Sequence, residues 1–203
     1  MNLSNHVLHV IFEYTAHDKI EDAVIARNIR CIKFLRKQGA PWDTWSCASA
    51  ANYGHLECLR YLHEHGCPWN ESTCNAAAEY GHLDCLKYAH EHWCPWNEST
   101  CNAAASSGHL ECLRYLHEHG CPWDEITCES AADNGHLDCL RYLHENGCPW
   151  DEEVCTAAAD NGHLECLKYA HEHGCPWDED TYIMAAPECR KYMESQGLQL
   201  YRV

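Results

Sequence analysis

Residues Cys67 to Trp93 read CPWNESTCNAAAEYGHLDCLKYAHEHW, and this stretch recurs along the chain with few changes. Its opening tripeptide, Cys-Pro-Trp, occurs five times at a constant spacing of 27 residues, beginning at Cys67, Cys94, Cys121, Cys148 and Cys175. A fixed period of this length is typical of a solenoid, in which one small supersecondary unit is repeated and stacked. We therefore predict one elongated array with atypical ends in this chain of 203 residues, rather than separate globular domains.

Each copy of the repeat predicts two short helices. Asn70 follows Pro-Trp and precedes Glu71, and a short oxygen-bearing side chain before an acidic residue is typical of a helix N-cap. The first helix is expected over residues 71–79, with Gly81 just past its end. His82 opens the second helix, which a glycine and then a proline terminate in most repeats. Helices shorter than about 12–15 residues are marginal alone in water, so the repeats must stack. The expected fold is an all-α solenoid of helix-turn-helix repeats.

The two ends of the array depart from the repeat. Cys31 lies 27 residues before Cys58 in a degenerate first repeat, and the residues before it predict an additional apolar helix. In the last repeat Arg190 stands where Leu167 stands one repeat earlier, which provides the polar outer face that a terminal repeat needs. We divide the chain into an N-terminal cap with the degenerate repeat, five full repeats and a C-terminal capping repeat, at residues 1–40, 41–175 and 176–203.

The recurring string T-C-x-A-A-A-x-x-G-H-L-[ED]-C-L-[KR]-Y-L-x-x-x-G resembles the ankyrin repeat, over about residues 18 to 197. Cys74 and Asn75 replace the Leu and His of the usual Thr-Pro-Leu-His tetrapeptide. The period is also shorter than the usual length of about 33 residues, and the missing residues fall where ankyrins carry a β-hairpin finger. The resemblance implies a solenoid without fingers, in which the histidine of Gly-His-Leu bonds the neighbouring loop and the first helices line a protein-binding surface.

Charge is distributed unevenly along the chain, whose net charge is -17. Residues 1–40 carry six basic and four acidic groups, whereas residues 122–148 and 149–175 each carry one basic and six acidic groups. An acidic array repels phosphate backbones, so we expect no nucleic-acid partner. A protein partner with a basic or neutral surface suits this charge better.

Hydropathy and cysteine usage bear on location. No stretch approaches the roughly 18 consecutive apolar residues of a membrane span, so no membrane association is expected. The N-terminus, MNLSNHVLHVIFEYTAHD, has neither a basic region nor a small-residue cleavage site, which argues against a signal peptide. The 17 cysteines are odd in number and follow the repeat, so they should remain thiols in a reducing compartment. We expect a cytoplasmic or nuclear protein and leave its oligomeric state open.

Cysteine and histidine are frequent enough to raise a metal-binding alternative. His90 and Cys94 lie four residues apart, as does the equivalent pair in other repeats, but zinc takes four ligands and two repeats would have to donate jointly. Cys74 and Cys85 occupy positions where ankyrins have Leu and Val, which favours small buried hydrophobic residues. We predict structural thiols, no metal and no cofactor, and we expect the tryptophan of Cys-Pro-Trp to fill the core.

No catalytic residue stands out, and every candidate group is repeated five times, so we expect no enzymatic activity. The first helix instead offers a candidate binding face. Cys74, Ala77 and Ala78 are constant between repeats, whereas positions 72, 75 and 79 vary at the i, i+3 and i+7 spacing of one helical stripe. Exposed aromatic and aliphatic side chains on such a stripe suit protein contact, although a merely solvated face is the alternative. The predicted partner-binding residues are Trp45, Tyr53, Ser72, Asn75, Tyr80, Asn102, Ile126, Glu129, Glu153 and Thr156.

These observations favour a protein–protein interaction scaffold. A second hypothesis rests on residues 3–14, LSNHVLHVIFEY, which resemble the first helix of an F-box, often L-P-x-x-V-L-x-x-I-F-x-Y. Ser4 replaces the usual proline, and a plain hydrophobic capping helix explains the same residues. The resemblance implies a substrate adaptor of a ubiquitin ligase. A metal-binding repeat protein is the third and least favoured hypothesis.

Overall fold

The computed structural model describes residues 20–197, and every regular element within this range is a helix. The helices are α2 (Ile20–Ile25), α3 (Ile29–Lys37), α4 (Thr44–Asn52), α5 (Leu56–Glu64), α6 (Glu71–Glu79), α7 (Leu83–Glu91), α8 (Glu98–Ser106), α9 (Leu110–Glu118), α10 (Glu125–Asp133), α11 (Leu137–Glu145), α12 (Glu152–Asp160), α13 (Leu164–Glu172), α14 (Glu179–Met184) and α15 (Pro187–Ser195). The predicted all-α repeat is confirmed, and the first helix expected over 71–79 is α6 itself. Even-numbered helices are the first helices of the repeats, and odd-numbered helices are the second.

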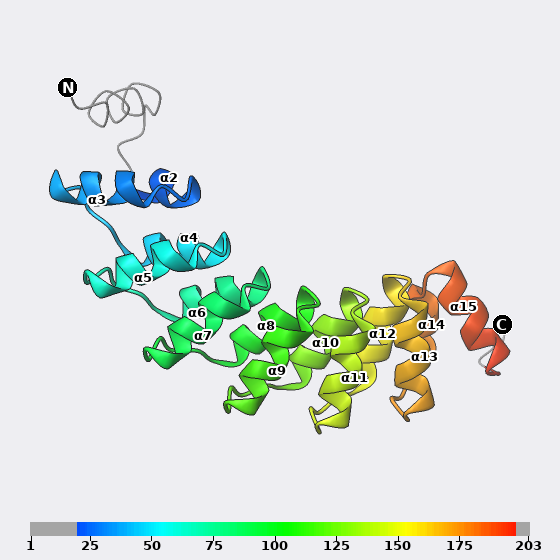
Figure 1. Ribbon diagram of the computed structural model, residues 1–203. Coiled ribbons are helices and arrows are strands. Elements are labelled where there is room, and N and C mark those ends of the chain that lie inside the picture. Colours follow the sequence, from blue (N-terminus) through cyan, green and yellow to red (C-terminus); the bar gives the residue numbers. More distant parts are fainter. Residues whose placement is uncertain (1–19, 198–203) are drawn as a thin grey trace. The chain divides into compact units, whose positions relative to one another are not determined.

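The chain divides into two compact units. Among the described residues, the first unit contains 20–77 together with 82–95, and the second contains 78–81 together with 96–197. Within the second unit the first helices α8, α10 and α12 pack side by side in one layer, and the second helices α9, α11 and α13 pack in another (Figure 1). Within the first unit α2 packs on α4, and α5 packs on both α3 and α7. Each unit is therefore a stack of helix pairs.

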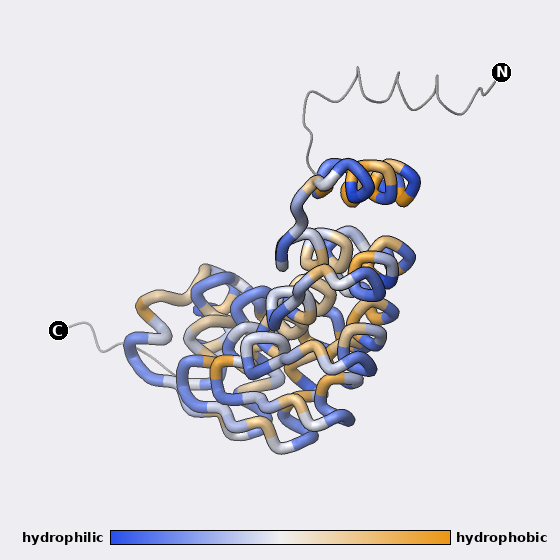
Figure 2. Tube along the Cα trace, turned by 90° about the vertical axis from the view of Figure 1, so that its left-hand side faces the viewer, coloured by the Kyte–Doolittle hydropathy of each residue, from blue (hydrophilic) through white to orange (hydrophobic). Residues whose placement is uncertain are grey.

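The core of each repeat is built from small side chains on the first helix and larger ones on the second. In the second unit, α8 buries Cys101 and Ala104, while α9 buries Leu113 and Leu116. Alanine and cysteine let neighbouring first helices approach closely, and each buried leucine contributes roughly 1.5–3 kcal/mol to stability. Hydrophobic segments are short and alternate with hydrophilic ones along the described chain (Figure 2). Among residues 20–197, no helix combines the length and apolar character needed to cross a membrane.

The predicted N-caps begin the first helices. Asp124 precedes α10 in extended backbone, and its N–H donates to Oγ1 of Thr127 at 3.3 Å, as one half of a capping box. Asn97 caps α8 in the same way, and its side chain also accepts from the N–H of Ser99 at 3.1 Å. These bonds satisfy backbone groups that a helix start leaves without partners. The Asx residue after Pro-Trp therefore sets where each of these first helices begins.

Two kinds of glycine end the helices, and both have positive φ. Gly108 ends α8 with φ 73°, and a Cβ there would lie 2.5 Å from Nδ1 of His136. Gly120 ends α9 with φ 78°, but a Cβ there would meet no atom within 4 Å. Glycine is therefore required at Gly108 by both conformation and space, and at Gly120 by conformation alone.

The tryptophan of Cys-Pro-Trp does not fill the core as expected. Trp123 is half-buried, and its ring stacks on that of His117 with the centroids 4.0 Å apart. Trp150 stacks in the same way on His144. The prediction was wrong because the linker carries the indole to the outer end of the preceding second helix, where an imidazole rather than the aliphatic core receives it.

The C-terminal repeat shows what replaces an aliphatic side chain at the end of the array. The Arg190 guanidinium donates to the carbonyl oxygens of Tyr182, Ile183 and Ala185 at 3.3, 3.0 and 2.9 Å. These bonds satisfy carbonyl groups around the end of α14. The predicted N-terminal helix and the F-box-like segment lie outside the described residues, and the division into caps and repeats stays a prediction.

Candidate protein-binding surface

The cysteine of each Cys-Pro-Trp connects two neighbouring repeats through its thiol. Within the second unit, Sγ of Cys121 donates to the carbonyl oxygen of Asn97 at 3.2 Å, and Sγ of Cys148 donates to that of Asp124 at 3.2 Å. The acceptor is in both cases the N-cap residue of the first helix, 24 residues earlier. In the first unit Cys67 bonds the carbonyl oxygen of Asp43 in the same way. The most regular motif of the sequence is therefore a connection between repeats.

The surroundings of most of the other cysteines disfavour ionisation of the thiol. All 17 cysteines lie within the described residues, and 16 of them are buried. A hydrogen bond with the Cys121 thiol, together with burial, raises the pKa of the Cys101 thiol. Burial, followed by the nearby Asp138 carboxylate, raises the pKa of Cys139 to about 12. Thiols that stay protonated are poor nucleophiles and poor metal ligands.

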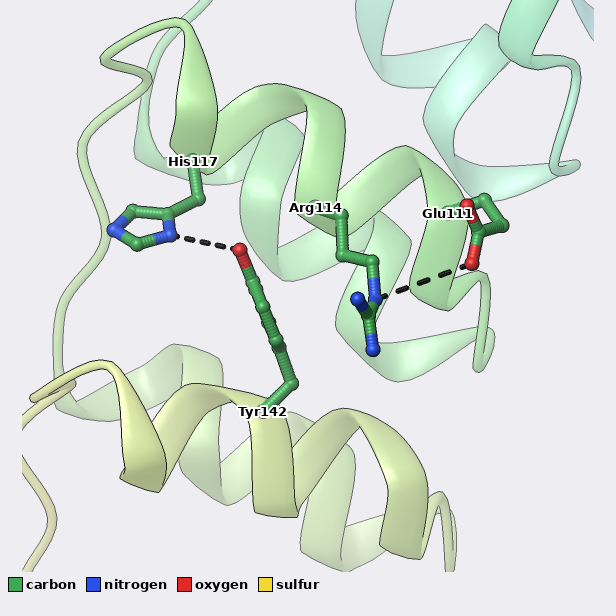
Figure 3. Close-up of polar contacts among 4 residues, drawn as sticks. All are labelled: Glu111, Arg114, His117 and Tyr142. Carbon is green, nitrogen blue, oxygen red and sulfur yellow. Dashed lines mark hydrogen bonds and ion pairs between the residues drawn. The ribbon is translucent and has the colours of Figure 1, made fainter.

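Four second-helix histidines, His63, His117, His144 and His171, are each hydrogen-bonded to a tyrosine hydroxyl group of the next second helix. His117 on α9 lies with Nδ1 2.9 Å from Oη of Tyr142 on α11, and the two are hydrogen-bonded (Figure 3). Arg114 lies over the Tyr142 ring at 5.0 Å and 3.9 Å from the Glu111 carboxylate. His117 and Cys121 thus have separate partners, although their spacing allowed a ligand pair. Between residues 20 and 197, no group of three or more His, Cys, Asp or Glu side chains is placed to hold a metal ion.

The histidine of Gly-His-Leu joins its repeat to the end of the first helix in the repeat before it, as at His82 and His136. Nε2–H of His136 donates to the carbonyl oxygen of Ser106 at 3.1 Å, and Nε2–H of His82 donates to that of Asn52 at 2.9 Å. This is the role that the resemblance implied. The same ring occupies the space beside the glycine that ends the first helix, which explains the close approach at Gly108.

The predicted partner-binding residues fall into two groups by exposure. Trp45, Tyr53, Tyr80, Ile126 and Glu153 are exposed, with Trp45 at 69%, Tyr80 at 51% and Ile126 at 49%. The half-buried residues are Ser72, Asn75, Asn102, Glu129 and Thr156. Trp45, Tyr53, Ser72 and Asn75 belong to the first unit, and the other six belong to the second.

Part of the predicted stripe connects first helices to one another. Asn102 accepts a hydrogen bond from Oγ1 of Thr127 on the next first helix. Thr156 and Thr181 are bonded similarly, with their Oγ1 atoms 2.9 Å apart. These side chains lean toward the neighbouring repeat, so they offer a partner less area than the exposed group does. Glu129 lies in the same column and is half-buried among other carboxylates.

An acidic field surrounds Glu129 on the second unit. Burial, and then the charges of Glu153, Asp133 and Asp151, raise the pKa of the Glu129 carboxyl group. The secondary contribution comes from carboxylates close enough to repel the ionised form of Glu129. The first-helix face of the second unit thus combines repelling carboxylates with the exposed aliphatic side chain of Ile126.

Comparison with known proteins identifies the family to which this fold belongs. A family model described as "Ankyrin repeats (3 copies)" matches residues 45–127 and 74–148. The chain belongs to the ankyrin-repeat family. The chain is also similar to the crystal structure of the human ASB11 ankyrin repeat domain, with a TM-score of 0.73 and 18% identity over 89% of this chain and 99% of that one. At this identity the likeness shows the fold alone, and no curated protein gives a significant match to the sequence.

Ankyrin repeats generally mediate protein–protein interaction, and members of the family are typically not enzymes. In these ankyrin repeats, the short linkers from Gly120 to Asp124 and from Gly147 to Asp151 contain no strand, as the short period predicted. The second helix therefore leads directly into the next N-cap, with no projecting finger on these linkers.

One exposed aromatic residue of these ankyrin repeats was missed by the sequence reasoning. Trp93 is 92% exposed and has φ 65°, at the position where four other repeats have glycine. The signal was present in the alignment of the repeats, because tryptophan replaces Gly66, Gly120, Gly147 or Gly174 there. A glycine at this position indicates the end of a helix and does not by itself indicate an exposed side chain.

Proposed function

We propose that this chain is a non-enzymatic scaffold that binds a protein partner through its first helices, with each unit presenting a first-helix face of its own. The observation that carries the proposal is the exposure of Trp45, Tyr80 and Ile126, large apolar side chains at first helices or the turns that follow them. Their exposed area contributes little to folding, but it would be removed from water by a partner. Aromatic side chains in particular are enriched at protein interfaces.

The charges beside Ile126 support a partner with a basic or neutral surface. Burial, and then the charges of Glu153, Asp133 and Asp151, raise the pKa of the Glu129 carboxyl group. Cationic side chains of a partner would relieve this repulsion and would also speed the encounter. We expect the affinity to decrease as salt concentration increases, because the exposed charges become screened.

The test is partner capture by variants that keep the fold. Trp45→Ala combined with Tyr80→Ala should reduce recovery of the captured protein. Ile126→Asp should also reduce recovery, and this variant tests the second unit alone. Glu165→Ala is the matched surface control, since Glu165 is exposed on a second helix. Far-UV circular dichroism should be unchanged in every variant. Equal capture by the double variant and the wild-type chain, with the fold intact, would refute the assignment.

A substrate adaptor of a ubiquitin ligase is the second candidate, supported by the F-box-like sequence of residues 3–14. It would use the same first-helix face to hold a substrate. Binding of the purified F-box-binding subunit of the ligase to the full chain separates the two candidates, with a chain lacking residues 3–14 as the control. The free cysteines support a cytoplasmic or nuclear location for either role.

A further inference from the structure

Trp93 occupies a backbone conformation that the repeat demands but that tryptophan disfavours. The N–H of Trp93 donates to the carbonyl oxygen of His90 at 3.0 Å, and the N–H of Cys94 donates to that of Ala89 at 2.9 Å. These two bonds form the turn that ends α7, and they require a positive φ at the residue between helix and linker. Glycine adopts that conformation without cost, whereas a bulky L-residue there is an outlier.

The Trp93 side chain makes no packing contribution that would offset this backbone strain. It is 92% exposed, so almost none of its apolar surface is buried. The glycines at the equivalent position are Gly66, Gly120, Gly147 and Gly174, and a Cβ at any of them would meet no atom within 4 Å. A side chain at this position therefore extends into open space. Residues that are held in strained conformations without a structural benefit occur preferentially at functional sites.

The surroundings of Trp93 favour a cation. The segment around Trp93, residues 88–100, contains two glutamates and no lysine or arginine. Glu91 lies two residues before Trp93 and is exposed, and the negative end of the α7 dipole is at the same place. A guanidinium group can stack on an indole and bind a carboxylate through two hydrogen bonds at once.

The open indole ring favours arginine in particular. The neighbouring rings are already engaged, because Trp69 stacks on His63 at 3.9 Å and His92 lies 4.2 Å from Tyr88. Trp93, which is 92% exposed, therefore offers an open indole ring outside any aromatic cage, and a flat guanidinium stacks on such a ring better than a compact ammonium does. Phosphate-bearing ligands are disfavoured by the glutamates.

We propose that Trp93 anchors a second protein-docking site, at the C-terminal end of α7, which takes an arginine-bearing basic segment of a partner protein. The arginine guanidinium stacks on the indole and pairs with the Glu91 carboxylate. This site lies on the linker side of a second helix and is separate from the first-helix face, so it does not depend on the function proposed above.

The experiment measures binding of a fluorescein-labelled hexa-arginine peptide to the full chain by fluorescence anisotropy at physiological ionic strength. Trp93→Gly should weaken binding about two- to fivefold, the range expected for loss of an exposed cation–π contact. Its melting temperature should stay equal or increase, because glycine relieves the positive φ. Loss of binding therefore cannot be attributed to unfolding.

Two further variants separate a specific site from general attraction to an acidic chain. Glu91→Gln should weaken binding, whereas Glu172→Gln, the same charge change at the equivalent position of α13, should leave it unchanged. Gly147→Trp, added to Trp93→Gly, should restore binding at the end of α11, where Glu145 precedes the linker. Equal affinity of the wild-type chain and Trp93→Gly, or equal loss from both glutamate variants, would overturn the proposal.

Discussion

Replacing glycine by alanine at two helix ends should have different costs, because only one of the two positions lacks space. Gly120→Ala places a Cβ at φ 78° with no atom within 4 Å. The left-handed conformation costs alanine roughly 1–2 kcal/mol, and the smaller entropy of the unfolded chain offsets about 0.4–1 kcal/mol of this. The expected net loss of unfolding free energy is about 1 kcal/mol.

Gly108→Ala carries the same conformational cost and a steric cost in addition. Its Cβ would lie 2.5 Å from Nδ1 and 2.9 Å from Cγ of His136, so the ring must move. Movement breaks the 3.1 Å bond from Nε2–H to the carbonyl oxygen of Ser106, which is worth about 1 kcal/mol. The expected loss is therefore about 2–3 kcal/mol, clearly more than at Gly120.

Urea unfolding followed by far-UV circular dichroism measures both values, and the slopes should match those of the wild-type chain. The deciding control is a double-mutant cycle with His136→Ala. Without the ring, Gly108→Ala should cost no more than Gly120→Ala does. If the two single variants agree within about 0.5 kcal/mol in the wild-type background, the steric argument is wrong.

Three further predictions concern the network between repeats. Native protein treated with Ellman's reagent should show one rapidly reacting thiol, Cys31, because the other 16 cysteines are buried; several fast thiols would contradict the packing. Tyr142→Phe should lower the unfolding free energy by about 1 kcal/mol through loss of the bond to His117, and an unchanged urea midpoint would show that this bond adds nothing. Burial, and then the charge of His173, lower the pKa of His144, so the unfolded chain takes up protons first as the pH falls below 6.5. The melting temperature should therefore decrease across this range, and His144→Gln should reduce the decrease.

The helices themselves were predictable from local sequence. Asn70, Glu71 and Gly81 are cap and stop residues whose effect depends on a few neighbours, and the helix between them begins and ends as expected. The same holds for His82, which precedes α7 directly. Because the chain repeats one 27-residue segment, a correct prediction of the helix ends in one repeat holds for the other repeats as well.

The contacts between repeats were less accessible to sequence reasoning. Helical spacing places Asn102 on the variable stripe, but the packing of α8 against α10 turns it toward Thr127. The stacking of Trp123 on His117 depends on the path of the linker, which no propensity describes. Trp93 was visible as a substitution for glycine, yet its exposure and its strain are properties of the folded turn.

The thiol of Cys-Pro-Trp binds a carbonyl group 24 residues earlier in each of the repeats that it joins, and this constancy bears on how the gene can change. A deletion or duplication of one whole 27-residue segment inside a stack brings together two surfaces that already fit each other. Unequal recombination between repeats can therefore shorten or lengthen the array while every new junction retains its thiol bond. Changes of any other length would shift the cysteine away from its acceptor. The array is thus suited to grow or shrink in whole repeats, while individual exposed side chains vary independently of its length.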